Sequence, residues 1–239
     1  MDSLLEKKIP FCIQARIGSS RLPAKILLNF GNKSVLNNLI DRVYKIKKIL
    51  KLHSKIFILV PINEVAFFEN HVDLRKTKVF GGDHLNVAKR YLSFCKKYSS
   101  EYVWRITSDN PFLTYEPFEI IINYFKNNKT KDIISLYHQK KLPNGNVISL
   151  LTRSQLNKIC KYGSFNDKQH IVLKNKYSNI KNPEIPANLT YPNCDFSINE
   201  INDYYKLKKY YKFLSKNISL KKILKNKKLI RECFTKKNY

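Results

Sequence analysis

A polar segment near the start of the chain, residues 15–25, is rich in residue types that bind phosphate. It contains three cations, one glycine and two serines: Arg16, Arg21, Lys25, Gly18, Ser19 and Ser20. Glycine lets a backbone turn closely, and the N–H groups of such a loop can face an anion while nearby cations add charge-assisted hydrogen bonds. The segment therefore predicts a phosphate-binding loop, with a solvated surface loop as the alternative. Its spacing matches neither a Walker A loop nor a dinucleotide-binding fingerprint.

A carboxylate candidate follows the apolar run at residues 102–107, where the chain reads Ser108-Asp109-Asn110-Pro111. Ligands of open α/β sheets bind beyond the carboxyl ends of strands, so a carboxylate at this position would point into the crevice. Mg²⁺ takes hard oxygen ligands, which makes Asp109 a candidate metal ligand. The alternative is an Asx turn ahead of a proline, which is common.

Strand-like and helix-like segments alternate through most of the chain. Short apolar runs predict strands at residues 9–14, 55–60, 78–80, 102–107, 132–137 and 147–151. Apolar residues at helical spacing predict helices at residues 34–49, 64–74, 86–98, 116–127, 153–162 and 167–177, the first of them capped by Ser34. A short strand at residues 195–198 and a helix at residues 200–214 complete the pattern.

This order of elements predicts an α/β fold. Strand–helix–strand units with right-handed crossovers give a mainly parallel sheet with helices on both faces. Both polar loops follow predicted strands, so we expect residues 15–25 and 108–111 to share one crevice at the carboxyl ends. The chain shows neither an internal repeat nor a Gly/Ser linker. The simplest division is one domain over residues 1–215 with a basic, helical C-terminal extension at residues 216–239.

The composition is that of a folded protein, since 43% of the 239 residues are hydrophobic. No apolar run is long enough to cross a membrane, and the first residues lack the apolar core of a signal peptide. We therefore expect no membrane insertion and a cytoplasmic location. The five cysteines are scattered and form no Cys/His cluster, which indicates neither a zinc site nor a disulfide framework.

The formal net charge of +27 is the most extreme bulk property of the chain. Such a charge can indicate nucleic acid or another anionic surface as partner. Only eight of the 45 basic residues are Arg, however, and Lys is the less specific reader of phosphate. Abundant Lys, Asn, Ile and Tyr also follow from a biased composition, so a nucleic-acid partner is the less favoured interpretation. A basic field would equally attract a nucleotide and an acidic sugar.

The string IQARIGSSRLPAKIL, residues 13–27, resembles the signature loop of the sugar cytidylyltransferases. It is most similar to the spore-coat-polysaccharide-type branch, and more distantly to the acylneuraminate and 3-deoxy-manno-octulosonate cytidylyltransferases. The family pattern is roughly ARxGSxRLPGKxL, and this chain carries Ala24 where glycine is usual. The resemblance implies a nucleotide-diphospho-sugar-transferase-like (Rossmann-like) fold.

The same resemblance implies roles for single residues. Arg16, Lys25 and Asp109 are the implied catalytic residues. The implied nucleotide-binding residues are Ala15, Arg16, Gly18, Ser19, Ser20, Arg21, Lys25, Arg105 and Thr107. Residues 105–111 are similar to the family's RITGDCP, whose Asp binds Mg²⁺, and this makes Asp109 the implied metal ligand. Residues 197–203 match the family's VDTPEDL, so Asn199 replaces a second metal-binding Asp and would offer an uncharged amide oxygen.

Two further stretches, residues 143–147 and 167–170, resemble the family's PxGxDVE and REHV motifs on the sugar side of the site. Asn146 and Gln169 stand where the family has acidic residues. His170 could contact a sugar carboxylate, although a lone histidine is more often structural.

The resemblance implies an enzyme that joins CMP from CTP to an acidic sugar and releases pyrophosphate, for surface glycan synthesis. Mg²⁺ is the implied cofactor, CTP and a sugar are the implied partners, and a homodimer is expected from the relatives. One alternative is a glycosyltransferase, and another is a degenerate member without activity, because Asn199 removes a charge from the metal site. A basic nucleic-acid-binding protein is the alternative of another class. The spacing of residues assigns no general base.

Overall fold

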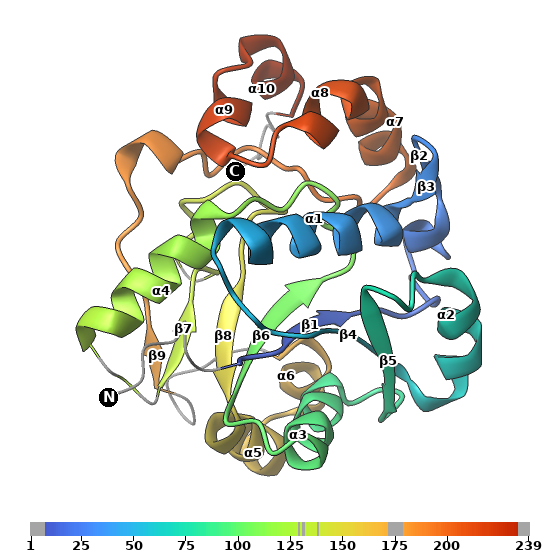
Figure 1. Ribbon diagram of the computed structural model, residues 1–239, viewed down its shortest axis with the longest axis vertical. Coiled ribbons are helices and arrows are strands. Elements are labelled where there is room, and N and C mark those ends of the chain that lie inside the picture. The colour runs from blue at the N-terminus through green and yellow to red at the C-terminus, as the bar shows by residue number, and fades with distance from the viewer. Residues whose placement is uncertain (1–7, 129, 131, 138, 172–178, 234–239) are drawn as a thin grey trace.

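The computed structural model describes residues 8–128, 130, 132–137, 139–171 and 179–233 (Figure 1). The strands are β1 (Phe11–Gln14), β2 (Asn29–Phe30), β3 (Lys33–Ser34), β4 (Ile56–Pro61), β5 (Thr77–Gly82), β6 (Tyr102–Thr107), β7 (Ile133–Ser135), β8 (Ser149–Thr152) and β9 (Ile180–Lys181). The α-helices are α1 (Val35–Ile49), α2 (Val65–His71), α3 (Val87–Lys97), α4 (Glu116–Asn128), α5 (Arg153–Tyr162), α6 (Phe165–His170), α7 (Ile201–Lys209), α8 (Tyr211–Lys216), α9 (Leu220–Leu224) and α10 (Lys227–Cys233).

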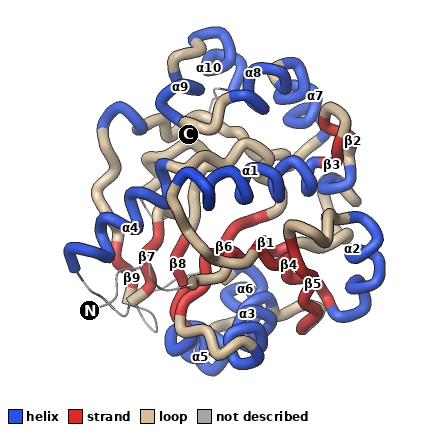
Figure 2. Tube along the Cα trace, in the orientation of Figure 1, coloured by secondary structure: helices blue, strands red, loops and turns tan. Residues whose placement is uncertain are grey.

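The main sheet has seven strands in the order β5-β4-β1-β6-β8-β7-β9, and β2 pairs with β3 in a separate hairpin (Figure 2). Strands β5, β4, β1 and β6 pair in parallel, as do β7 and β9. Strand β8 runs antiparallel to both of its neighbours, β6 and β7. The predicted mainly parallel sheet is therefore confirmed, with β8 as its antiparallel strand.

Alternating side chains of the central strands enter two hydrophobic clusters on opposite faces of the sheet. On β1, Phe11 and Ile13 belong to the larger cluster and Cys12 to the smaller one. On β6, Trp104 and Val103 divide in the same way. Helices α1, α2 and α4 contribute to the larger cluster, while α3 and α5 contribute to the smaller one. Figure 1 shows α6 beside α3 and α5, so helices cover both faces as predicted.

The parallel pairing of β1 and β6 brings the two polar loops together. Gln14 and Thr107 are register partners at the carboxyl ends of these strands. The chain therefore leaves β1 into residues 15–25 and β6 into residues 108–111 from neighbouring points on one edge. The N–H group of Ile198 donates to the carbonyl oxygen of Asp109 at 2.9 Å, which holds a third segment at the same edge. The predicted shared crevice is confirmed.

Several predicted elements differ from the structure; the predicted strand 132–137, for example, is reduced to Ile133–Ser135. Residues 195–198 form no strand, because the N–H groups of Phe196 and Ile198 donate to loop carbonyls at Asn144 and Asp109 rather than to the sheet. The predicted helix 200–214 is divided into α7 and α8 at Tyr210, whose N–H donates to Leu207 in a tightened turn. Helix α6 begins earlier than predicted, and residues 172–178 of that prediction lie outside the described residues.

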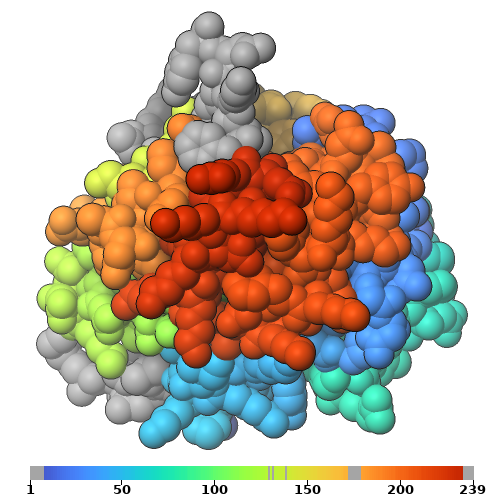
Figure 3. All heavy atoms as spheres, turned by 90° about the horizontal axis from the view of Figure 1, so that it is seen from above, coloured from blue at the N-terminus to red at the C-terminus, as the bar shows by residue number. Residues whose placement is uncertain are grey.

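The C-terminal helices pack on the same core as the sheet. Leu220, Ile223 and Leu229 are fully buried in the larger hydrophobic cluster. The buried carboxylate of Glu116 on α4 accepts hydrogen bonds from Ser219 Oγ and from the Leu220 N–H, at 2.6 and 2.8 Å. Figure 3 shows α7–α10, in orange to red, covering one end of the molecule. The division at residues 215 and 216 stays a prediction.

None of the helices in the described residues is both long enough and apolar enough to cross a membrane.

Candidate functional site

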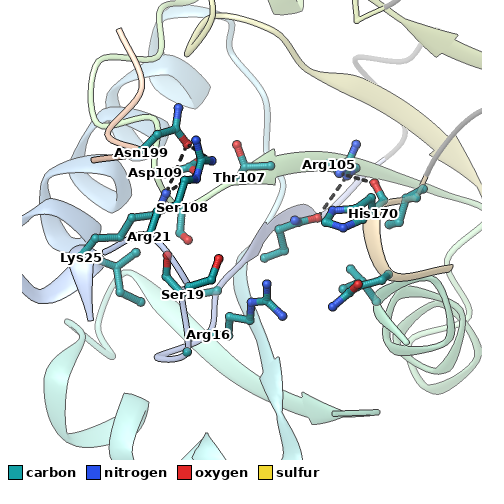
Figure 4. A pocket seen from close by; sticks show the side chains of 18 of the residues that line it. Arg16, Ser19, Arg21, Lys25, Arg105, Thr107, Ser108, Asp109, His170 and Asn199 are labelled. Atoms are coloured by element: carbon teal, nitrogen blue, oxygen red, sulfur yellow. Dashed lines mark hydrogen bonds and ion pairs between the residues drawn. The ribbon is translucent and has the colours of Figure 1, made fainter. Parts of the chain in front are cut away.

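A cavity of about 560 Å³, here called the main cavity, opens at the carboxyl ends of β1 and β6 (Figure 4). All of the site residues predicted from the sequence line it: Ala15, Arg16, Gly18, Ser19, Ser20, Arg21, Lys25, Arg105, Thr107, Asp109 and Asn199. The cavity is also lined by other residues, most of which the sequence analysis did not predict as site residues: Gln14, Ile26, Val87, Arg90, Ser108, Tyr137, Gln169, His170 and Ile171. The fold thus gathers every predicted site residue, while the role of each stays a prediction.

The pleat of the sheet decides which side chains reach the main cavity. Successive side chains on a strand point to opposite faces, so Gln14 shares a face with Cys12, and Arg105 with Val103. Cys12 and Val103 belong to the smaller cluster beneath α3 and α5. Near the ends of the strands Gln14 and Arg105 lie on this same face and line the cavity.

The loop of residues 15–25 offers unpaired donors to a ligand. Among the described residues, the N–H groups of Gly18, Ser19 and Ser20 have no hydrogen-bond partner. The loop is anchored at its ends, since Ala24 N donates to Ile17 O and Ile17 N donates to a carboxylate oxygen of Glu64, both at 3.0 Å. Successive unpaired N–H groups in an anchored loop are the kind of donors that can bind an anion.

The glycine and the alanine of this loop have roles that differ from the sequence-based expectation. Gly18 has no left-handed backbone angle, and a Cβ added there would meet nothing within 4 Å. Its lack of a side chain therefore leaves open space at the loop rather than enabling a turn. Ala24, by contrast, has φ +52° in the left-handed region that favours glycine. This conformation explains why glycine is usual at that position of the motif.

Three oxygen atoms converge on the ammonium group of Lys25. Its Nζ lies 2.9 Å from Asp109 Oδ2, 2.6 Å from the carbonyl oxygen of Ile198 and 3.5 Å from Asn199 Oδ1. The amide oxygen of Asn199 also accepts from Arg21 Nη2 at 3.1 Å. The two predicted metal ligands therefore lie together and already surround a cation, which links the β1 loop to the β6 loop (Figure 4).

The donor set at Lys25 fits a hard divalent cation in kind. Among the described residues, no group of three or more His, Cys, Asp and Glu side chains is placed to hold a metal. Mg²⁺ commonly takes only one or two carboxylates from protein and completes its shell with water and phosphate oxygens. Asp109 and Asn199 supply two of the oxygen ligands it prefers, with one negative charge between them.

The far end of the main cavity is formed by residues of β1, β6, α6 and the segment that follows β7. Arg105 Nε donates to Gln14 Oε1 at 3.1 Å, and Arg105 Nη2 donates to the carbonyl oxygen of His170 at 2.8 Å. The guanidinium lies over the ring of Tyr137, 5.3 Å from its centroid. Gln14 and Tyr137 were not predicted from the sequence, although Tyr137 closes the predicted strand 132–137.

Arg90 of α3 is buried and lines the main cavity. Its guanidinium donates to the carbonyl oxygens of Leu59, Asp83 and His84. Burial lowers the pKa of this guanidinium. Because these carbonyls engage all three of its nitrogens, Arg90 fixes the turn that follows β5.

Comparison with known proteins identifies the family. The model of the cytidylyltransferase family matches residues 11–227. A protein of Methanocaldococcus jannaschii is 35% identical over 132 residues, covering 53% of each chain. The spore coat polysaccharide biosynthesis protein SpsF of Bacillus subtilis is 31% identical over 115 residues, covering 48% of each chain. The chain thus spans about half the length of the curated relatives that it matches.

Solved structures show the same fold. A cytidylyltransferase from Leptospira borgpetersenii superposes with a TM-score of 0.76 at 24% identity, over 93% of this chain and 96% of that one. CMP:2-keto-3-deoxy-manno-octonic acid synthetase, solved with CTP, gives a TM-score of 0.60 at 16% identity, over 87% of this chain and 99% of that one. These likenesses confirm the predicted nucleotide-diphospho-sugar-transferase-like architecture.

Proposed function

The chain belongs to the cytidylyltransferase family, and we propose that it transfers CMP from CTP to an acidic sugar, with release of pyrophosphate, in the synthesis of a surface glycan. The observation that carries this proposal is the pairing of two features across one crevice. Unpaired N–H groups and three cations lie on the β1 loop, and the oxygen set of Asp109 and Asn199 lies opposite.

Nucleotidyl transfer needs neutralised phosphate charge and an acceptor oxygen in line with the α-phosphorus. We assign the N–H groups of Gly18, Ser19 and Ser20 to the phosphate oxygens, because they have no hydrogen-bond partner among the described residues. Arg16 is exposed at the cavity and has no hydrogen-bond or ion-pair partner among the described residues, so its guanidinium is available for the triphosphate. The acceptor hydroxyl attacks the α-phosphorus and loses its proton to solvent, while the bond between the α-phosphorus and the oxygen that bridges to the β-phosphorus breaks. Arg16, Arg21 and Lys25 stabilise the negative charge that gathers on the departing pyrophosphate.

Asp109 and Asn199 would hold a Mg²⁺ ion. The ion, when bound, neutralises phosphate charge and fixes the orientation of the triphosphate. Lys25 Nζ already lies among these oxygens, so binding of metal and nucleotide would turn the ammonium from Asp109 toward the phosphates. Lys25 would then carry its charge to the triphosphate without leaving the crevice.

Pyrophosphate release from CTP, measured with a panel of acidic sugars, tests this function. We expect Arg16→Ala and Asp109→Ala to lower the rate at least about 100-fold. The first variant removes a cation that faces the phosphates, and the second removes the carboxylate that would hold the Mg²⁺ ion. Arg75→Ala is the matched control, since Arg75 is an exposed arginine outside the cavity whose partner is Asp73. Unchanged turnover in both cavity variants would contradict the proposed site. Equal turnover with ATP would contradict the choice of CTP.

A further inference from the structure

Arg105 is a buried cation that has no anionic partner among the described residues. The residue is only 7% exposed, yet no carboxylate among the described residues forms an ion pair with it. Its hydrogen-bond acceptors are the amide oxygen of Gln14 and the carbonyl oxygen of His170, both neutral. A buried charge costs free energy unless it is paired, so a guanidinium held this way is poised for an anion from outside the protein.

The remaining donors of Arg105 face a ligand site rather than the core. Within the described chain Nη1 has no hydrogen-bond partner, and the residue lines the main cavity. Gln14, His170 and the ring of Tyr137 hold the guanidinium in place, which lowers the entropy lost on binding. Arg90 is a useful contrast, because its nitrogens all donate to carbonyl oxygens and keep little capacity for a ligand.

Arg105 is also set apart from the phosphate-binding end. Figure 4 shows Lys25, Arg21, Asp109 and Asn199 grouped at one end of the cavity, and Arg105 with His170 at the other. The β1 loop already supplies cations and N–H groups for a triphosphate. An anion at Arg105 must therefore come from a second group, carried by the other substrate.

We propose that Arg105 binds the carboxylate of the acceptor sugar and thereby selects an acidic over a neutral acceptor. This inference rests on the proposed function and moves Arg105 from the nucleotide to the acceptor. A planar guanidinium with free N–H groups matches a carboxylate through two parallel hydrogen bonds. Tyr137, stacked on the guanidinium, is the positioning residue of this pair.

The test compares acidic and neutral sugars on the full chain. The probes are glucuronate, N-acetylneuraminate and 3-deoxy-manno-octulosonate, with glucose, N-acetylmannosamine and mannose as neutral counterparts. Their affinities are measured by ligand-observed NMR on the nucleotide-free chain and on the chain loaded with CTP in the absence of a divalent metal, so that the sugar is not consumed. Arg105→Gln removes the charge. Arg105→Lys keeps the charge but cannot donate the two parallel hydrogen bonds of a guanidinium. The control is Arg153→Gln, which replaces an exposed arginine on α5.

We expect at least one acidic sugar to bind more tightly than its neutral counterpart. Arg105→Gln should weaken that binding roughly 10- to 100-fold, the range for a lost charge-assisted hydrogen-bond pair. Arg105→Lys should weaken it less, and Arg153→Gln should leave it unchanged. Affinity for CTP should stay within about 2-fold in Arg105→Gln, which also shows that the variant is folded.

Three outcomes overturn the inference. In the first, no acidic sugar binds more tightly than its neutral counterpart. In the second, Arg105→Gln weakens the binding of acidic and neutral sugars alike, and in the third it weakens the binding of CTP as strongly as that of the acidic sugar. Failure of the proposed function has a different signature, because the wild-type chain would then fail to bind CTP. Binding of acidic sugars to the nucleotide-free chain tests Arg105 even in that case.

Discussion

Lys25 contacts both predicted metal ligands and so connects the β1 loop to the rest of the site. Its ammonium group lies 2.9 Å from Asp109 Oδ2 and 3.5 Å from Asn199 Oδ1. A lysine cation in the oxygen set competes with any metal ion for the same lone pairs. With Asn199 in place of an aspartate, the set carries only one negative charge, so the balance between ammonium and metal is shifted toward the ammonium.

The Asn199→Asp variant tests this balance. A second carboxylate should raise the affinity for Mg²⁺ or Mn²⁺ in the presence of CTP by roughly 10-fold, about 1.4 kcal/mol. Calorimetric titration of the metal into the CTP-loaded chain measures this directly. The matched control is Asn202→Asp, which adds the same charge at an exposed position of α7 outside the main cavity. An equal gain in both variants would show that net charge, and not the oxygen set, governs metal binding.

The β1 loop shows how local backbone geometry shapes the site at the scale of an element. Ala24 sits in the left-handed region just before Lys25, and its N–H closes the loop onto Ile17. A side chain in this conformation costs free energy because Cβ approaches the following carbonyl group. The strained residue thus lies one position before the lysine that crosses the crevice.

Replacing Ala24 with glycine should relieve the strain. We expect Ala24→Gly to raise the free energy of unfolding by a net of about 1 kcal/mol. This value is the relief of backbone strain after subtraction of the larger conformational entropy of glycine in the unfolded chain. Thermal unfolding should show a Tm increase of roughly 2–4 °C. The control is Ala66→Gly on α2, where an exposed helical alanine is replaced and the Tm should fall. A lower Tm in Ala24→Gly would refute the strained geometry.

Elements with strong periodicity could be predicted from the sequence, and isolated contacts could not. Strand β6 and helix α5 have the predicted ends, because an apolar run and a helical stripe each end at clear turn residues. Residues 195–198 misled the prediction, since Phe196 and Ile198 are buried although they belong to a loop. Arg105 could be predicted as a site residue from its motif, but its partners Gln14 and Tyr137 meet it only through the strand order.

At the scale of the whole molecule, charge and topology favour the same kind of ligand. The net charge of +27 attracts anions in general, and the main cavity concentrates cations at the carboxyl edge of the sheet. A nucleic-acid partner would use the same field over a broad surface, with affinity that falls steeply as salt rises. A nucleotide substrate would instead use the cavity and depend on the divalent metal.

The most direct test is the thermal stability of the chain with each of the four nucleoside triphosphates, with and without Mg²⁺. A ligand at 100 times its Kd stabilises the folded state by about 2.7 kcal/mol. For a chain of this size this corresponds to a Tm increase of roughly 5–10 °C. We predict that increase for CTP with Mg²⁺, smaller shifts for ATP, GTP and UTP, and little shift for an RNA oligonucleotide. No shift with CTP and Mg²⁺, or an equal shift with RNA, would contradict a CTP site at the β1 loop.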